Sequence, residues 1–207
     1  MQFLLYFIIA YLVGSIPNAV WIGKLFFNTD VRNFGSKNAG ATNTIRVLGT
    51  KIGVTVLILD ILKGVLATNI PFFFNYNNIN PDNQLNIEYA CGIIAVFGHI
   101  FPIFAQFKGG KGVATLLGVC IALLPLPVLG SLIVFIIVFI ITRYVSLSSM
   151  FAAVLLPFFS IIIFSNNATS QIIFTCLIAV IVPITHLKNI KRLLNGTESK
   201  FVFRKNK

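Results

Sequence analysis

The features that most constrain the fold are long apolar runs, which cover residues 1–23, 52–74, 89–107, 112–142 and 144–187. About twenty apolar residues are enough to span a bilayer as a helix. Only 10% of the residues are charged, whereas a soluble domain carries about a quarter. The sequence therefore predicts an all-α integral membrane protein. Residues 1–23 lack a basic start and are expected to form a retained first helix.

Two of these runs are long enough to hold more than one helix. Pro125 and Pro127 divide residues 112–142, and prolines end or kink helices. Ser165, Asn166 and Asn167 divide residues 144–187 in the same way, and the Asn-rich stretch 75–86 is expected to be a loop. With two helices in each long run, the chain has seven transmembrane helices, some of them short.

The distribution of lysine and arginine supports this count. With seven crossings and the N-terminus outside, every such residue except Lys63 falls on the inner side. A single helix over 112–142 would instead place Arg143 and the basic tail outside. We therefore expect one multi-pass membrane domain over residues 1–207, with a cytoplasmic C-terminus and a cytoplasmic basic tail at 188–207. The net charge of +11 is interpreted as a membrane anchor, and nucleic acid is not expected as a partner.

Cysteines and acidic residues indicate neither disulfides nor a metal site. Cys91, Cys120 and Cys176 lie in apolar runs and are widely spaced, which is typical of buried free thiols. The five acidic residues are scattered, so no set of hard-metal ligands is predicted. No cofactor is expected.

The first predicted inner loop, Asp30–Arg46, is dense in hydroxyl, amide and small side chains. Its glycines allow backbone N–H groups to approach a ligand closely, and an arginine offers a planar fork suited to phosphate. Its candidate ligands for a phosphate or an oxyanion are Ser36, Thr42, Asn43 and Arg46. A solvated loop that caps the neighbouring helices is the alternative interpretation.

The second inner loop, Phe107–Thr115, runs from glycines and lysines directly into a helix start. Glycine-rich nests and helix N-termini both attract anions. The candidate phosphate-binding residues here are Lys108, Gly109, Gly110, Lys111 and Gly112. The run is not a Walker loop, because Gly112 stands where that motif needs Ser or Thr. A tight basic turn that anchors the helix is the alternative.

Several polar residues outside these loops are weaker candidates. Asp60 and Lys63 lie three residues apart on one helical face, either as a functional pair or as a structural ion pair. His99 lies near the inner end of the third run, and His186 and Asn189 share a face at the inner end of the last; a histidine there is often a cap. Ser146 follows Arg143, and serines at a helix start are usually caps.

Together, the inner loops and the apolar helices predict an enzyme that joins a soluble phosphate compound to a fatty acyl group. Two glycine-rich basic loops and Arg46 suit phosphate, and apolar helices suit an acyl chain. One alternative is a transporter or channel for an organic phosphate or another anion, which intramembrane charges and broken helices would favour. Another is a structural membrane subunit without catalysis.

The motifs also resemble a known family. The matching runs are Gly14–Pro17, Gly35–Arg46, Asp60–Gly64, Gly98–Pro102, Phe107–Thr115, Arg143–Leu147 and His186–Glu198. In these runs the sequence resembles the bacterial acyl-phosphate:glycerol-3-phosphate acyltransferases, the PlsY family, over nearly the whole chain. Gly-His-x-Phe-Pro followed by Gly-Gly-Lys-Gly-Val-Ala-Thr is its most specific part. The histidine-x₄-aspartate signature of other acyltransferases is absent. One departure is Lys37, where the family usually has a small residue, often glycine.

This resemblance implies transfer of a fatty acyl group from acyl phosphate to the 1-hydroxyl of glycerol 3-phosphate. The products would be lysophosphatidic acid and phosphate, in the first acylation step of phospholipid biosynthesis. It implies a monomer or homodimer among membrane lipids, in the bacterial inner membrane, with the active site facing the cytoplasm. An acyl phosphate is a mixed anhydride with a good leaving group, so a covalent nucleophile is not required.

The resemblance also assigns roles to the candidate residues. The expected catalytic residues are Ser36, His186 and Asn189. The expected phosphate-binding residues are Arg46, Lys108, Gly109, Gly110, Lys111, Gly112, Thr42 and Asn43. The expected substrate-binding residues are Ser146, His99, Asp60 and Lys63. The proton acceptor stays open between His186 and the phosphate of the substrate.

Overall fold

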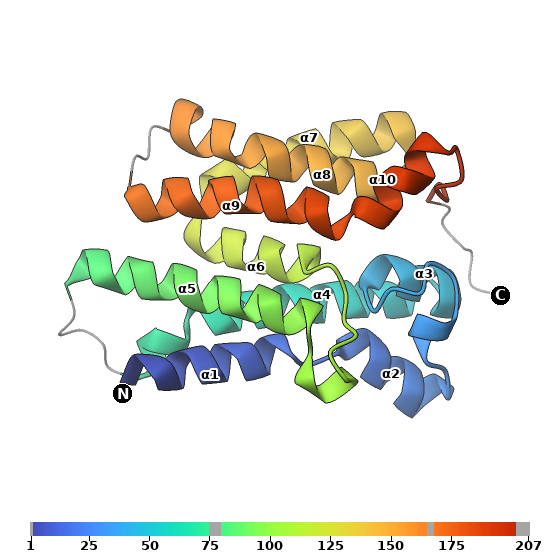
Figure 1. Ribbon diagram of the computed structural model, residues 1–207, viewed down its shortest axis with the longest axis horizontal. Helices are drawn as coiled ribbons and strands as arrows, with labels where there is room; N and C mark the ends of the chain where they lie inside the picture. Colours follow the sequence, from blue (N-terminus) through green and yellow to red (C-terminus); the bar gives the residue numbers. More distant parts are fainter. Residues whose placement is uncertain (1, 75–79, 165–167, 202–207) are drawn as a thin grey trace. The chain divides into compact units, whose positions relative to one another are not determined.

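A computed structural model describes residues 2–74, 80–164 and 168–201 (Figure 1). Every regular element within these ranges is helical, which confirms the all-α prediction. The chain divides into two compact units, with the boundary between Leu123 and Leu124. Unit 1 precedes this boundary and unit 2 follows it, and each is described by itself.

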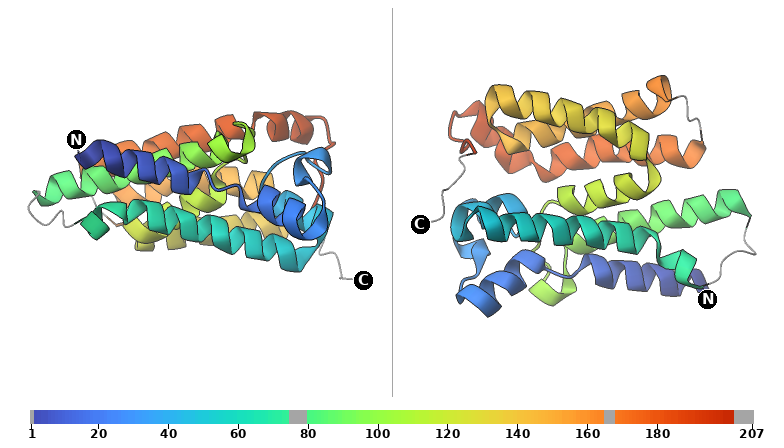
Figure 2. Two further views of the ribbon diagram at one scale, coloured as in Figure 1. Left: turned by 90° about the horizontal axis from the view of Figure 1, so that it is seen from below. Right: turned by 180° about the vertical axis from the view of Figure 1, so that it is seen from behind.

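Unit 1 is built around the long helix α4. Its elements are α1 (Gln2–Gly14), α2 (Asn18–Phe27), η1 (Val31–Asn33), α3 (Ala41–Leu48), α4 (Thr50–Thr68), η2 (Ile70–Phe74), α5 (Pro81–Ile100), η4 (Ile103–Ala105) and α6 (Val113–Leu123). Helix α4 packs against α1, α3, α5 and α6, and α1 packs along α5 (Figure 2).

Small residues let these helices approach one another closely. A Cβ atom added at Gly14 of α1 would collide with the backbone of Ala95 in α5. A Cβ at Gly64 of α4 would collide with the carbonyl of Thr115 in α6. Close backbone approach at glycines is a common way to pack helices within a membrane. These contacts hold α4, α5 and α6 close enough together for their polar side chains to meet.

The first predicted span is a broken helix. Helix α1 ends at Gly14 and α2 begins at Asn18, with a bend of 42° between them. The prediction of one helix over residues 1–23 is therefore wrong. Pro17 stands at the break, and proline cannot donate the backbone hydrogen bond that a continuous helix needs.

Two other boundaries differ from the predictions because tertiary packing overrides local composition. Helix α5 begins at Pro81, so the predicted loop over 75–86 is wrong from Pro81 onward, and residues 75–79 lie outside the described residues. Its first turns pack through Ile87 into a core with Tyr6 and Ala67. Helix α3 lies inside the first predicted loop, which is thus partly helical.

Unit 2 contains α7 (Pro125–Thr142), α8 (Val145–Pro157), the π-helical turn η5 (Phe158–Ile163), α9 (Thr169–Thr185) and α10 (Leu187–Leu194). Helix α8 packs against both α7 and α9. The predicted division at Pro125–Pro127 is confirmed, because α6 ends at Leu123 and α7 begins at Pro125. Helices flank the second predicted divider, Ser165–Asn167, which itself lies outside the described residues.

By length and composition, three helical segments of the described chain could each cross a membrane: Asn83–Ala105, Pro125–Thr142 and Val145–Ile163. Two bent pairs, α1 with α2 and α9 with α10, raise this number to five if each pair is one span. Cys91 and Cys120 are buried and free, as predicted, but Cys176 is exposed, so that part of the cysteine prediction is wrong. Large apolar side chains are exposed along these helices, as expected where lipid is the solvent.

Candidate active site

The first loop is organised around the side chain of Asn43. Its Oδ1 accepts a hydrogen bond from the backbone N–H of Ser36 at 2.8 Å. Its Nδ2 lies within hydrogen-bonding distance of three backbone carbonyls, those of Val31, Phe34 and Asn38, at 2.8–3.1 Å. Asn43 is only 1% exposed. The residue predicted as a phosphate ligand therefore has its amide engaged inside the loop, where it fixes the position of Ser36.

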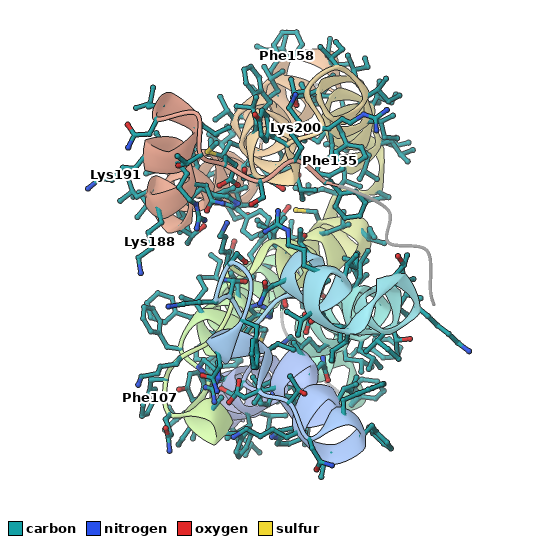
Figure 3. The ribbon with its side chains drawn as sticks, turned by 90° about the vertical axis from the view of Figure 1, so that its right-hand side faces the viewer. Phe107, Phe135, Phe158, Lys188, Lys191 and Lys200 are labelled. Carbon is teal, nitrogen blue, oxygen red and sulfur yellow. The ribbon has the colours of Figure 1, made fainter. Side chains whose placement is uncertain are left out.

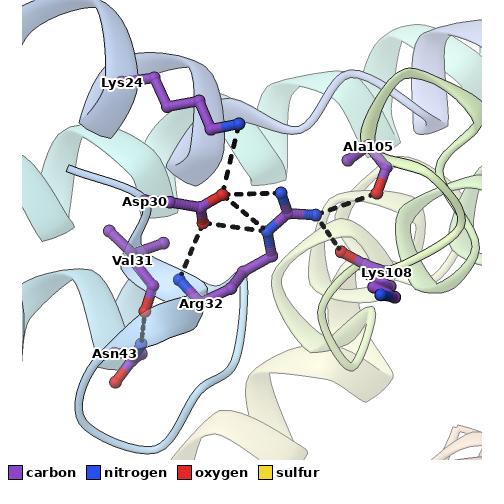
Figure 4. A network of polar contacts seen from close by, with 7 residues as sticks. All are labelled: Lys24, Asp30, Val31, Arg32, Asn43, Ala105 and Lys108. Atoms are coloured by element: carbon purple, nitrogen blue, oxygen red, sulfur yellow. Dashed lines mark hydrogen bonds and ion pairs between the residues drawn. The ribbon is translucent and has the colours of Figure 1, made fainter. Parts of the chain in front are cut away.

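The start of the same loop is joined to the second loop by Arg32. Its guanidinium donates to both oxygens of Asp30 at 2.7–3.3 Å, and its Nη1 donates to the carbonyls of Ala105 and Lys108 at 2.9 and 3.3 Å (Figure 4). Lys24 adds an ion pair to Asp30 at 3.4 Å. The hydrogen bond from Arg32 holds the pKa of the Asp30 carboxyl well below its usual range, although partial burial opposes this shift.

The glycine-rich loop folds back onto the end of α5. The N–H of Gly109 donates to the carbonyl of Ile100 at 3.2 Å, and that of Gly110 donates to the carbonyl of His99 at 3.1 Å. A Cβ added at Gly110 would collide with the ring of His99 and would lie 3.3 Å from the carbonyl of Ala39 in the first loop. The two loops are thus in contact, and glycine is required at this point.

The loop then turns into α6 through Gly112, whose φ of +80° lies in the left-handed region that favours glycine. Helix α6 begins at the next residue, Val113, so the backbone N–H groups of its first turn follow directly on the loop. Lys111 lies at this junction and is partly buried, as is Arg46 on α3. This geometry agrees with the prediction that glycines and lysines run into a helix start.

A buried polar network lies behind the glycine-rich loop. Asp60 and Lys63 of α4 form the predicted ion pair, with Nζ 3.1 Å from Oδ1 and side-chain exposures of 2% and 5%. Asn18 donates to Asp60 at 2.9 Å, and Nζ of Lys63 donates to the carbonyl of Ile16 at 2.8 Å. This pair therefore reaches the break between α1 and α2.

His99 connects this network to the loop. Its Nδ1 lies 3.8 Å from Oδ1 of Asp60 and 3.0 Å from Oγ1 of Thr115 in the first turn of α6. Its backbone carbonyl accepts from Gly110. His99 thus contacts the glycine-rich loop and the helix that follows it, and it is itself 6% exposed. Three of the four residues predicted to bind substrate (Asp60, Lys63 and His99) lie together in a buried cluster within unit 1.

In unit 2, the side chains of Ser146 and Asn189 both bind the carboxylate of Glu198. Ser146 donates from Oγ, and Asn189 from Nδ2, to the same carboxylate oxygen, each at 2.7 Å. Arg192 donates to the other oxygen at 2.9 Å. The Glu198 side chain is 6% exposed. This carboxylate therefore fixes the positions of Asn189, which was predicted to be catalytic, and Ser146, which was predicted to bind substrate.

His186 lies where the last helix bends. Helix α9 ends at Thr185 and α10 begins at Leu187, with a bend of 58°. The Nδ1 atom of His186 lies 2.8 Å from the carbonyl of Val182. Because a carbonyl can only accept, Nδ1 carries the proton in this contact, and Nε2 is then the basic nitrogen of the neutral ring. Asn189 follows one turn later, as the predicted shared face requires.

The basic tail begins on α10, and Lys188 and Lys191 project outward from that helix (Figure 3). Both are exposed. After α10 the chain folds back: the N–H of Phe201 donates to the carbonyl of Arg143 at 2.8 Å, and the ring of Phe201 packs edge-on against Phe139. This return segment places Glu198 beside Ser146.

Four residues of these clusters were not predicted to have a role: Asn18, Arg32, Thr115 and Glu198. The scarcity of acidic residues could have indicated some of these contacts. In so basic a chain, each carboxylate has many cations with which it can pair. Asp30, Asp60 and Glu198 are each paired with a base. In the described ranges, no group of three or more His, Cys, Asp or Glu residues could hold a metal ion.

Comparisons with known proteins show the family of this chain. The profile of the family described as glycerol-3-phosphate acyltransferase matches residues 4–196. Glycerol-3-phosphate acyltransferases of Enterococcus faecalis and Fusobacterium nucleatum are 45% and 46% identical to this chain. Both alignments cover 98% of this chain, with 94% and 100% of the respective relatives. Glycerol-3-phosphate acyltransferase 2 of Bacillus anthracis is 48% identical over 94% of this chain and 97% of its own length.

Two solved structures of PlsY, an integral membrane glycerol 3-phosphate acyltransferase, share the fold. Its glycerol 3-phosphate form matches with a TM-score of 0.86 and 38% identity, over 98% of this chain and 96% of that one. Its lysophosphatidic acid form matches with a TM-score of 0.83 and 36% identity, over 98% and 97%. These matches define an all-helical integral membrane protein of the acyltransferase class. The chain belongs to the glycerol-3-phosphate acyltransferase family.

Proposed function

We propose that this protein transfers a fatty acyl group from acyl phosphate to the 1-hydroxyl of glycerol 3-phosphate. The products are lysophosphatidic acid and inorganic phosphate, and the reaction is the first acylation of phospholipid biosynthesis. The observation that carries the proposal is the match, over 98% of the chain, to PlsY in its glycerol 3-phosphate and lysophosphatidic acid forms. The approach of Gly110 to Ala39 adds local support, because it brings the glycine-rich loop against the first inner loop.

In the proposed reaction, the 1-hydroxyl oxygen attacks the acyl carbonyl, the bond from carbonyl carbon to phosphate oxygen breaks, and phosphate leaves. Arg46, Lys111 and Thr42 bind phosphate, together with the backbone of Gly109, Gly110 and Gly112. Ser36 stabilises the developing oxyanion from the position that Asn43 fixes. Asn43 thereby acts on the loop rather than on the ligand.

Ser146, Asn189 and His186 hold and activate the glycerol hydroxyls in this proposal. The shared carboxylate of Glu198 orients Ser146 and Asn189. Nε2 of His186 accepts the hydroxyl proton, directly or through the phosphate of the substrate. Asp60, Lys63 and His99 support the glycine-rich loop from behind, through the contact of His99 with Gly110.

We further propose seven transmembrane spans for one domain over residues 1–207. The spans are α1 with α2, α4, α5, α6, α7, α8 with η5, and α9 with α10. The N-terminus is then outside, and the basic tail 188–207 and the active site face the cytoplasm. Bacterial relatives and the integral membrane structures of PlsY support the bacterial cell (inner) membrane as the location. We expect a monomer or homodimer, which light scattering on the purified protein would measure.

Among the structural features that would favour the transporter alternative is the broken helix α1–α2. The carbonyl of Ile16 at that break accepts a hydrogen bond from Lys63 of the same chain. The unwound backbone is thus engaged by an internal cation, which fits a structural role better than an ion site.

Phosphate release tests the proposed function. The purified protein in detergent is mixed with acyl phosphate and glycerol 3-phosphate, and inorganic phosphate is followed with time. Release should require glycerol 3-phosphate and should be lost in Lys111→Ala. Lys188→Ala is the matched control, because it removes an exposed lysine from the tail and should keep the wild-type rate. Equal release from wild type and Lys111→Ala would contradict the proposal.

A further inference from the structure

A basic pocket lies on unit 1, between the two inner loops. It has a volume of about 400 Å³ and is lined by Asp30, Arg32, Asn33, Lys37, Gln106, Lys108 and Gly109. Arg46 and Lys111, the cations of the proposed reaction, are not among the lining residues. Figure 4 shows Arg32 bridging the two walls, from Asp30 on one side to Ala105 and Lys108 on the other.

The charges of this pocket do not cancel. The carboxylate of Asp30 is matched by the guanidinium of Arg32, with Lys24 as an additional partner. The remaining cations of the wall are the amino groups of Lys37 and Lys108, both on exposed residues. Among residues 2–74, 80–164 and 168–201, no carboxylate forms an ion pair with either lysine. The pocket therefore presents two uncompensated positive charges and suits an anion.

Exposed aromatic residues stand next in sequence to residues of the pocket wall. Phe34 and Phe107, next in sequence to the lining residues Asn33 and Lys108, are 54% and 58% exposed. Phe107 is labelled in Figure 3 and has a φ of +58° in the left-handed region. Apolar side chains such as phenylalanine beside lysines are typical of segments that lie at the boundary between anionic headgroups and acyl chains. Phenylalanines beside lysines are therefore suited to a lipid headgroup more than to a free ion.

A second pair of exposed aromatic residues is connected to the pocket through Ala105 and Arg32. Phe104 is 49% exposed and directly precedes Ala105, whose carbonyl binds Arg32. The ring of Trp21, on α2, lies 6.0 Å from the ring of Phe104. Trp21 is 42% exposed and is the only tryptophan of the chain. The fluorescence of Trp21 therefore reports on lipid near the pocket.

We propose that this pocket binds the phosphate of an anionic membrane phospholipid. Lys37 and Lys108 contact the phosphate oxygens, and Phe34 and Phe107 contact the upper part of the acyl chains. The site shares Gly109 with the proposed phosphate loop but includes neither Arg46 nor Lys111, and it assigns Lys108 to lipid binding in place of the catalytic phosphate role predicted from sequence. The headgroup chemistry is an anionic phosphodiester, because two lysine point charges match one phosphate without requiring a bidentate fork.

Lys37 is the residue that makes the site specific to this chain. It stands where the resembling family usually has a small residue, and its φ of +59° lies in the left-handed region that favours glycine. Replacement by glycine therefore removes the charge without requiring a new backbone conformation. The variant Lys37→Gly should keep the fold and the catalytic rate measured without anionic lipid.

The test uses quenching of Trp21 fluorescence by brominated lipid in mixed bilayers that contain the full-length protein. Brominated phosphatidylglycerol is the anionic probe, and brominated phosphatidylcholine is the zwitterionic one. We expect the wild type to prefer the anionic probe, and Lys37→Gly to weaken this preference about five-fold, as expected for one lysine near an anionic surface. Lys51→Ala removes an exposed lysine of unit 1 outside the pocket and should leave the preference unchanged.

Two further measurements identify the ligand. Phe34→Ser combined with Phe107→Ser should weaken quenching by the anionic lipid, while inorganic phosphate up to millimolar concentrations should not displace the lipid. Equal losses in Lys37→Gly and Lys51→Ala would overturn the proposal, because the effect would then be general surface charge. Displacement by inorganic phosphate, with no effect of the phenylalanine changes, would also overturn it and would indicate a free-anion site. Neither result bears on phosphate release, which tests the proposed function separately.

Discussion

Unit 1 contains two acid–base clusters of similar composition in different surroundings. The first joins Asp60 and Lys63 between membrane helices, with side chains 2% and 5% exposed. The second joins Asp30 and Arg32 in the first loop, with side chains 14% and 18% exposed. In the helical cluster, neutral groups complete the hydrogen bonds of both charges: Asn18 donates to Asp60, and the carbonyl of Ile16 accepts from Lys63. In the loop cluster, both side chains are also partly exposed to solvent.

The difference shows that charge pairs serve two purposes here. A buried pair is held by its surroundings, and the loss of one partner leaves an uncompensated charge. A partly exposed pair contributes little stability, but Arg32 also joins two loops through the carbonyls of Ala105 and Lys108. We therefore expect the helical cluster to govern stability and the loop cluster to govern loop geometry.

The largest effect should follow removal of one partner of the buried pair. Asp60→Ala leaves the Lys63 ammonium without its carboxylate and should destabilise the protein by about 3–5 kcal/mol. Thermal unfolding in detergent measures this loss. Replacing both charges, in Asp60→Leu with Lys63→Met, should recover most of the stability. If Asp60→Ala were as stable as the wild type, the buried pair would not govern the stability of the protein.

The next effect concerns the link from the buried cluster to the glycine-rich loop. Gly110→Ala places a methyl group against the ring of His99, so the loop must shift. A displacement of about 1 Å can lower a rate about 100-fold, and we expect a loss of that order in kcat/KM. His99→Ala makes space for the methyl group, so the double variant should be more active than Gly110→Ala alone. Wild-type activity of Gly110→Ala would remove this loop from the proposed site.

A smaller effect is expected in the loop cluster. Arg32→Lys keeps the charge but cannot bind Asp30 and two carbonyls through one planar group. The expected loss in kcat/KM is about five-fold, with a change in unfolding free energy below about 1 kcal/mol. Lys24→Ala is the matched control, since its ion pair with Asp30 is longer, at 3.4 Å, and the lysine side chain is 55% exposed. If Arg32→Lys lowered stability as strongly as Asp60→Ala, the contrast between the clusters would fail.

The smallest effect is the pH dependence of the loop cluster. The pKa of Asp30 is lowered in the folded protein, chiefly by the hydrogen bond from Arg32, so its contribution is present above the unfolded carboxyl pKa of about 3.9. That contribution is lost progressively as the pH falls from about 5 through the lower folded value. The difference in unfolding free energy between wild type and Asp30→Asn should thus stay constant from neutral pH down to about 5 and shrink below it. A difference that already shrank between neutral pH and about 5 would contradict the assigned shift.

Much of the helical architecture could be predicted because apolar length and proline positions act locally. The division between α6 and α7 at Pro125 is such a case. Pro17 offered the same signal, but the apolar sequence around it favoured one continuous helix. The helical start of α5 at Pro81 could not be read from an Asn-rich composition, because its core contacts come from α1 and α4.

The candidate site was predicted better in its loops than in its supporting contacts. Glycines and lysines beside a helix start are a local pattern, and so is the spacing of Asp60 and Lys63. Glu198 was missed because it meets Ser146 only after the chain folds back, 52 residues later in sequence. The role of Asn43 was also missed, because residue type alone does not distinguish an amide that binds a ligand from one that holds a loop.

The ratio of the two products tests the central claim most directly. With acyl phosphate and labelled glycerol 3-phosphate, lysophosphatidic acid and inorganic phosphate should form in a one-to-one ratio, and both should disappear in Lys111→Ala. Phosphate release without lysophosphatidic acid would indicate hydrolysis or another acceptor, and would contradict the proposed acyl transfer.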